Sequence, residues 1–215
     1  MRFAFPAMSV TGLQPPLHPR KRPSQARSAV TVDAILEAAV RVLLADGYPR
    51  LTTRRVAEVA GVSVGSLYQY FPNRRSLVAE VIRRKVEEGV RCIEEAAARA
   101  DGPPAEAVAA VMAAFAAEKR RGLALSVVLR GPMAELEGRR ALAEGARRAE
   151  AILAGLLGRL LSRPLDAAEA ARLALAVAAL EGAVAAAAER DPAAFSDAAL
   201  GAVLARMLLG ALDLG

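Results

Sequence analysis

The chain has 215 residues, of which 54% are hydrophobic and 4% aromatic, enough for one large domain or two smaller ones with a sizeable core. One cysteine (Cys92) and one histidine (His18) exclude an internal disulfide, a structural zinc site and histidine-based catalysis in the folded part. The net charge of +6 is unevenly placed, because residues 20–85 hold 13 Lys and Arg against 5 Asp and Glu, whereas residues 86–215 hold 15 against 18.

The basic excess in residues 20–85 is typical of a module that meets phosphates, although a solvated face would have the same composition. Alanine and leucine dominate the chain, and no segment alternates polar and apolar residues as a half-buried strand does. We therefore expect an all-α fold. No apolar run reaches the ~20 residues of a membrane-spanning helix, so we expect a cytoplasmic protein without a membrane partner. Because the chain has one cysteine and one histidine, we also expect no metal, and nothing in the sequence indicates a cofactor.

Residues 1–28 are rich in proline, serine and basic residues and lack apolar periodicity, which predicts a disordered arm. The arm ends in a basic cluster, Arg20, Lys21, Arg22 and Arg27. Such arms often lie along a DNA backbone or in its minor groove. An inert tail, with Met8 as the true start, is the alternative.

Apolar residues at three- to four-residue spacing predict helices in the rest of the chain. Their ranges are 31–45, 54–60, 64–70, 74–99, 105–120, 123–130, 139–161, 167–189 and 197–212. Side chains that cap free N–H groups stand near several starts: a threonine of the pair Thr52-Thr53, then Ser63, Asn73, Asp166 with Glu169, and Ser196. Glycine and proline mark the stops, as at Gly47 and at Gly131-Pro132. We place one domain at residues 29–78 and a second at residues 79–215.

Residues 52–71 have the spacing of two short helices that cross at a sharp angle. Ala57 is small where the second helix would pack across the first, and Gly61 permits the positive φ of the turn. The expected small core comprises Val56, Ala60, Val62, Leu67 and Phe71. The expected outward face comprises Ser63, Val64, Gly65, Ser66 and Gln69. A face of this kind fits the major groove of DNA, which admits one helix.

These residues and their flanks resemble the TetR/AcrR family of transcriptional regulators. The resemblance lies in Gly47-Tyr48, Leu51-Thr52-Thr53, residues 56–63, residues 65–71 and residues 72–77, and covers about residues 30–80. It implies a helix-turn-helix that binds double-stranded DNA, followed by a helical domain that binds a ligand and forms a dimer. A bare helix-turn-helix pattern is weak, but this one continues on both sides in the family's order.

The resemblance also implies which residues contact DNA: Thr53, Arg54, Arg55, Ser63, Val64, Gly65, Ser66, Tyr68, Gln69, Tyr70 and Arg74. Thr53 and Ser63 would bind phosphate at helix N-termini, and Gln69 would bond adenine in the major groove. Tyr68 is equally compatible with a partly buried position. Arg75 stands where the family often has an acid, so DNA affinity is higher or another pairing is lost. Val64 and Gly65 offer few hydrogen bonds, so we expect DNA shape to carry much of the specificity.

Residues 167–189 and 197–212 correspond to the family's homodimer interface. The first segment is apolar nearly all round and rich in small residues, which favours close approach of a partner helix. An intramolecular core is the alternative. The pocket for an unidentified small-molecule effector would be lined by Met112, Phe115, Leu125, Val128, Leu129 and Met133, each of which could equally be plain core. Cys92 is expected to be a buried small hydrophobe.

We therefore expect a ligand-responsive regulator, by default a repressor, that binds a pseudo-palindromic operator as a dimer and is released by a mainly apolar effector. The main alternative is a helical ligand-binding or adaptor protein whose DNA-binding head does not function. A helical enzyme is the third alternative, but the folded part lacks histidines, cysteine pairs and acidic clusters, so we expect no catalytic residues.

Overall fold

The computed structural model describes residues 26–190 and 197–214; the cap expected at Ser196 and most of the expected arm lie outside these residues. Every regular element in the described part is a helix, which confirms the all-α prediction. The helices are α1 (Ala26–Arg50), α2 (Thr53–Ala60), α3 (Val64–Tyr70), α4 (Arg74–Arg99), α5 (Pro104–Arg121), α6 (Leu123–Ala134), α7 (Leu136–Leu160), α8 (Ala167–Arg190) and α9 (Asp197–Ala211).

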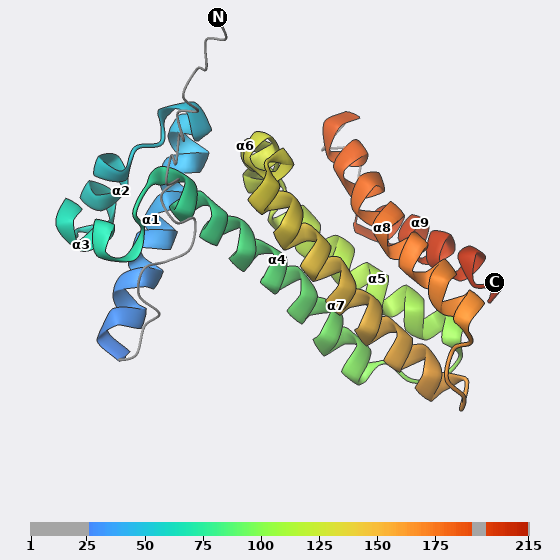
Figure 1. The fold of residues 1–215 in the computed structure, drawn as a ribbon. Coiled ribbons are helices and arrows are strands. Elements are labelled where there is room, and N and C mark those ends of the chain that lie inside the picture. Colours follow the sequence, from blue (N-terminus) through green and yellow to red (C-terminus); the bar gives the residue numbers. More distant parts are fainter. Residues whose placement is uncertain (1–25, 191–196, 215) are drawn as a thin grey trace, which may run out of the picture.

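The helices form two groups joined by the long helix α4 (Figure 1). At one end of α4, α1, α2 and α3 form a small head. Along the rest of α4 lie α5 and α7, and α8 and α9 cover the far side of the body, with α9 packed against α5. Helix α4 therefore belongs to both groups and links the head to the body.

Two apolar cores hold these groups together. The body core joins α4, α5, α7, α8 and α9 around side chains such as Phe115 and Leu157. The head core contains Ile35, Leu67 and Phe71, and it also takes in Leu129 of α6 and Ala141 of α7. Head and body are therefore connected by packed side chains of α6 and α7 as well as by α4.

Four helix boundaries differ by three residues or more from the sequence-based expectation. One is the end of α1, which runs to Arg50 but is interrupted at the expected stop, Gly47, where φ is 75°. Helix α1 starts at Ala26, five residues earlier than expected, because tertiary packing half-buries Ser28 and Ala29 and extends the helix into the predicted arm. Helix α6 continues past the expected stop to Ala134; Pro132 lies in its last turns, where it forfeits one helical hydrogen bond but is buried. Helix α7 starts at Leu136, three residues earlier than expected.

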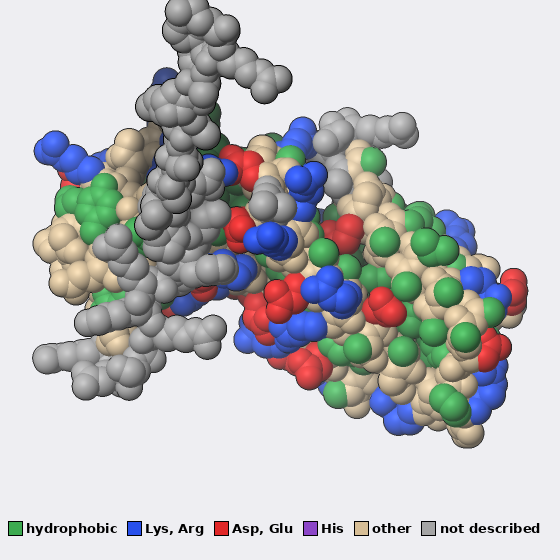
Figure 2. All heavy atoms as spheres, viewed as in Figure 1, with side chains coloured by type: hydrophobic (Ala, Val, Ile, Leu, Met, Phe, Trp, Pro, Cys, Tyr) green, Lys and Arg blue, Asp and Glu red, His purple; other side chains and the backbone are tan. Residues whose placement is uncertain are grey.

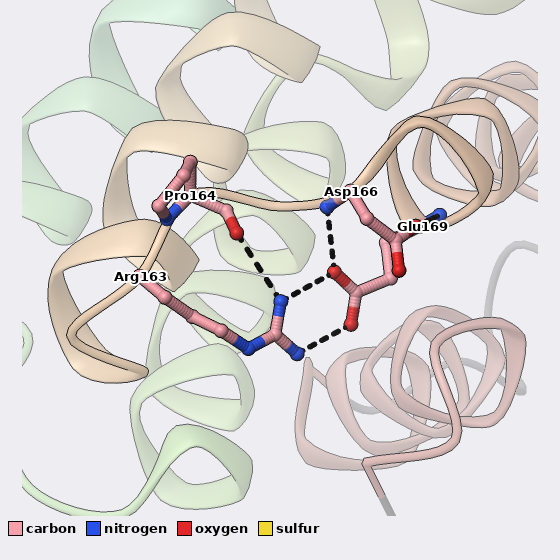
Figure 3. A network of polar contacts seen from close by, with 4 residues as sticks. All are labelled: Arg163, Pro164, Asp166 and Glu169. Atoms are coloured by element: carbon pink, nitrogen blue, oxygen red, sulfur yellow. Dashed lines mark hydrogen bonds and ion pairs between the residues drawn. The ribbon is translucent and has the colours of Figure 1, made fainter.

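The start of α8 has the capping box that the sequence predicted (Figure 3). The backbone N–H of Glu169 donates to Asp166 Oδ1, and that of Asp166 donates to Glu169 Oε2, each at 2.8 Å. Arg163 adds two hydrogen bonds of 2.7 Å to the Glu169 carboxylate. These bonds, the Arg163 pair first, lower the pKa of Glu169 to about 2.

None of the helices in the described ranges combines the length and apolar character needed to cross a bilayer.

Candidate nucleic-acid interface

Helices α2 and α3 meet at a tight turn formed by Gly61. Gly61 has a φ of 68°, the left-handed conformation that favours glycine, and it caps the end of α2. The N–H of Val62 then donates to the carbonyl of Ala57 at 3.0 Å, which fixes the direction in which the chain leaves α2. Ala57 is buried, with 1% of its surface exposed, as expected of a small residue where two helices cross.

Hydroxyl side chains cap both helices, as the sequence predicted. Thr52 Oγ1 accepts a hydrogen bond from the Arg55 N–H at 3.1 Å, and Ser63 Oγ accepts one from the Ser66 N–H at 3.0 Å. Thr53, the first residue of α2, shares a 3.0 Å hydrogen bond with the Tyr68 hydroxyl. This bond ties α2 to α3 and brings together two of the residues expected to contact DNA.

The outer face of α3 is the one predicted from the motif. Leu67 and Phe71 are fully buried in the head core. On the opposite side, Val64 is 38% and Tyr68 is 42% exposed. Ser63, Gly65 and Gln69 are also exposed, whereas Ser66 and Tyr70 are half-buried. The position of Tyr68, left open by the sequence, is on this outer face, so the helix presents small residues together with one aromatic ring.

The arginines around this face have different environments. Arg54 and Arg55 lie on the exposed side of α2, where both pair with Glu58 and Arg55 also lies 3.9 Å from Asp46. Exposed pairs of this kind are weak, so phosphate can compete for either guanidinium.

Arg74 is half-buried rather than freely exposed. Its guanidinium stacks over the Tyr48 ring, 4.5 Å from the centroid, and donates to the Leu51 carbonyl at 3.4 Å. The family resemblance includes Tyr48, but the sequence did not predict a role for this residue. The stack shows that Tyr48 positions an arginine at the base of α4, so any phosphate contact of Arg74 is made from a fixed position.

Arg75, which stands where the family often has an acid, forms an ion pair with a residue outside the head. Its guanidinium lies 2.8 Å from Glu135, at the junction of α6 and α7. On the other side of the head, Arg84 of α4 pairs with Asp33 of α1 at 2.6 Å. Arg75 therefore connects head to body, a role that the motif alone could not reveal because the partners are 60 residues apart.

The residues expected to line an effector pocket are not all in one place. Met112 and Phe115 line a small internal cavity of about 30 Å³. Met133 lines an adjoining groove of about 400 Å³ among α4, α5, α6, α7 and α8. Leu129 is fully buried in the head core, and Leu125 and Val128 pack against that core, because that side of α6 faces α1. Lys85, Lys119 and Arg139 of the groove were missed, since surface-like cations give no sequence signal of a pocket.

The outer surface of α8 and α9 is mostly apolar, with exposed leucine, valine and methionine side chains among alanines and glycines. Leu175 is 72% exposed, and Val203 and Met207 are 39% and 36% exposed. Figure 2 shows hydrophobic side chains spread over the outer side of α8, with the charged side chains mostly at its edges. A Cβ atom added at Gly182 or Gly210 would meet nothing within 4 Å, so packing within the chain does not require these glycines.

Cys92 lies half-buried on α4, where its thiol donates to the Ala114 carbonyl at 3.4 Å. Burial raises the pKa of this thiol, which keeps it protonated and unreactive.

Comparisons with known proteins place the head in a family. The family model for bacterial regulatory proteins of the tetR family matches residues 35–81. Nucleoid occlusion factor SlmA of Actinobacillus pleuropneumoniae is 31% identical over 98 residues, which are 45% of this chain and 48% of SlmA. The chain thus spans about half the length of the curated relatives that it matches.

Solved structures extend the likeness to the body. A TetR-family transcriptional regulator from Streptomyces coelicolor has a TM-score of 0.67 and 26% identity, covering 87% of this chain and 98% of that one. FadR from Bacillus subtilis, in complex with stearoyl-CoA, has the same fold with a TM-score of 0.64 at 21% identity, over 83% of this chain and 98% of FadR. The family match on residues 35–81 and this shared fold agree: the head is similar to bacterial regulatory proteins of the tetR family, and head and body together have the fold of a TetR-family transcriptional regulator.

Proposed function

We propose that this protein is a DNA-binding transcriptional regulator that recognises a pseudo-palindromic operator as a homodimer and responds to a small effector. The observation that carries the proposal is the α2–α3 unit. Its recognition helix is anchored by Leu67 and Phe71 and capped by Ser63, and it presents Gly65 and Gln69 outward. A rigid helix with an exposed, small-residue face is what entry into a major groove requires.

In this proposal the residues contact different parts of the DNA. Ser63, Thr53 and Tyr70, with Arg54, Arg55 and Arg74 nearby, lie where they would position the head on phosphates. Gln69 is the exposed residue on α3 with the donors and acceptors to read a base edge. Val64, Gly65, Ser66 and Tyr68 complete the surface, so shape contributes much of the specificity.

Dimerisation would use the outer surface of α8 and α9. The exposed Leu175, Val203 and Met207, together with glycines that are unneeded within the chain, supply an apolar surface that a second copy can approach closely. A two-fold axis through this surface would carry two heads on one side, as a pseudo-palindrome requires.

The effector would bind in the body, and we take repression by promoter occlusion as the sign of regulation. The groove of about 400 Å³ supports this part, because it is within the ~300–1,000 Å³ range of small-molecule sites. FadR, which shares the fold, was solved with stearoyl-CoA. Binding would act on DNA affinity through α4, α6 and α7, which join groove and head.

The test is selection of duplexes from a random pool by the purified protein, followed by fluorescence anisotropy with the selected and a shuffled duplex. We expect selective binding that weakens steeply with salt, because several phosphates are neutralised. Equal, weak binding to every duplex would instead identify a ligand-binding protein with a non-functional head.

A further inference from the structure

The groove among α4 to α8 has two chemically different parts. One part is apolar and comprises Val86, Leu123, Val127, Met133, Leu142 and Val184. The other part is basic, with Lys85, Lys119, Arg130 and Arg139 contributed by four different helices, and Glu181 as the one acid in the lining. The lining therefore carries net +3, although residues 86–215 as a whole carry 15 basic against 18 acidic residues.

One of these cations, Lys119, is already held in place. Its ammonium lies 3.4 Å from Glu181 Oε1 and 4.7 Å from the centroid of the Phe115 ring. The pair stands where the groove adjoins the small internal cavity, since both residues line both spaces. Lys119 and Glu181 largely neutralise each other, which leaves Lys85 and Arg139 to be considered as sources of positive charge.

Lys85 and Arg139 lack such a partner: within the described ranges, neither has a carboxylate oxygen within 4 Å. Lys85 is half-buried, and its ammonium occupies the space above Gly122, where a Cβ atom would overlap it. Burial, followed by the charge of nearby Lys119, lowers the pKa of Lys85. The carboxylates of Glu118, Glu88 and Glu181 offset this effect in part without forming an ion pair with Lys85. A desolvated ammonium without a direct ion pair is costly, and an anion placed beside it would recover part of that free energy.

We propose that the groove binds an anionic amphiphile, with its apolar chain against α6 and α7 and its carboxylate or phosphate head bound by Lys85 and Arg139. This inference rests on the proposed function, because it names the chemical class of the effector. A wholly apolar ligand would fill the same space but leave the half-buried Lys85 and the exposed Arg139 without an ion pair, so charge complementarity favours the acid over its neutral analogue.

The experiment is calorimetric titration of the full-length protein, without DNA, with laurate, lauroyl-CoA and dodecanol. The first two carry a carboxylate or phosphates on the same chain, and dodecanol is the neutral reference. The variants are Lys85→Met and Arg139→Met. Arg91→Met is the matched control, because Arg91 is exposed on the same helix as Lys85, pairs with Glu95 and does not line the groove.

We expect at least one anionic probe to bind about tenfold or more tightly than dodecanol, as one charge-assisted contact provides. Lys85→Met and Arg139→Met should each remove most of that preference while dodecanol binding and the Arg91→Met variant are unchanged. Whichever anion binds more tightly identifies the head group. Equal affinity for acid and alcohol, or no binding of any probe, overturns the inference. The proposed DNA-binding function is tested separately by operator binding, so it would not be contradicted by that result.

Discussion

Gly65 is the residue at which DNA binding and stability should respond in opposite directions. It lies on the exposed face of α3, and an added Cβ would make only ordinary contact with Ser63 Oγ at 3.8 Å. Gly65→Ala should therefore raise the free energy of unfolding by up to ~1 kcal/mol through helix propensity. If the backbone of α3 approaches the groove closely, the same methyl group should weaken operator binding at least about tenfold.

Urea denaturation and anisotropy on the same preparations check this prediction. Gly131→Ala is the control, because Gly131 is also an unobstructed helical glycine but lies on α6. Unchanged operator affinity in Gly65→Ala would show that α3 does not enter the groove with this face.

Glu169 should make stability depend on pH. Its pKa falls from the usual 4.5 to about 2 in the folded chain, so its contribution is full above pH 4.5 and is lost as pH falls toward 2. The urea midpoint of Glu169→Gln should therefore lie below that of the unsubstituted protein at pH 7, with the difference shrinking by pH 3. Glu106→Gln, in the first turn of α5, is the control. If the difference between the two urea midpoints were the same at pH 7 and pH 3, the pairing with Arg163 would not be what lowers the pKa of Glu169.

Individual residues also show what sequence could and could not predict. The caps at Thr52, Ser63 and Asn73 and the turn at Gly61 were predictable, because they depend on neighbours within a few positions. The Arg75–Glu135 ion pair was not, since it joins residues that only the tertiary fold brings together. For the same reason, the sequence did not predict that the groove cations lie together, since they come from four helices.

Among the elements, α9 approaches the backbone of α5 closely, and Gly201 makes this approach possible. A Cβ atom at Gly201 would lie 2.8 Å from Cα of Ala113 on α5, and backbone atoms cannot move aside cheaply. Gly201→Ala should lower the free energy of unfolding by roughly 1–3 kcal/mol, the usual cost of overpacking. Gly155→Ala, at an unobstructed glycine of α7, should not destabilise the protein. Equal stability of both variants in urea denaturation would refute the close approach.

Helix positions were predicted better than helix ends. Periodicity located each helix, but the start of α1 and the continuation of α6 through Pro132 depend on packing. Packing also decided the side of α6. Val128 and Leu129, expected in the pocket, pack with the head, and Leu125 packs against the head core while lining a separate groove between α1, α4 and α6. An apolar stripe indicates burial but not the partner that buries it.

At the scale of the whole molecule, the proposed dimer joins two heads through α8 and α9. Leu175→Glu should leave the monomer folded, because this side chain is 72% exposed, but place a charge in the dimer surface. We expect analytical ultracentrifugation to show a monomer. Leu44→Glu, at an exposed leucine of α1, should remain a dimer. If the Leu175→Glu variant remained a dimer, the dimer interface would not be the outer surface of α8 and α9.

The central claim is that a dimer presents two copies of α3 to one operator. It is tested most directly by anisotropy titration of the selected duplex and of the same duplex with one half-site scrambled, using the unsubstituted protein and Leu175→Glu. We predict that scrambling weakens binding of the unsubstituted protein at least about a hundredfold, and that the variant binds both duplexes equally weakly. Equal affinity of the unsubstituted protein for both duplexes would contradict the claim.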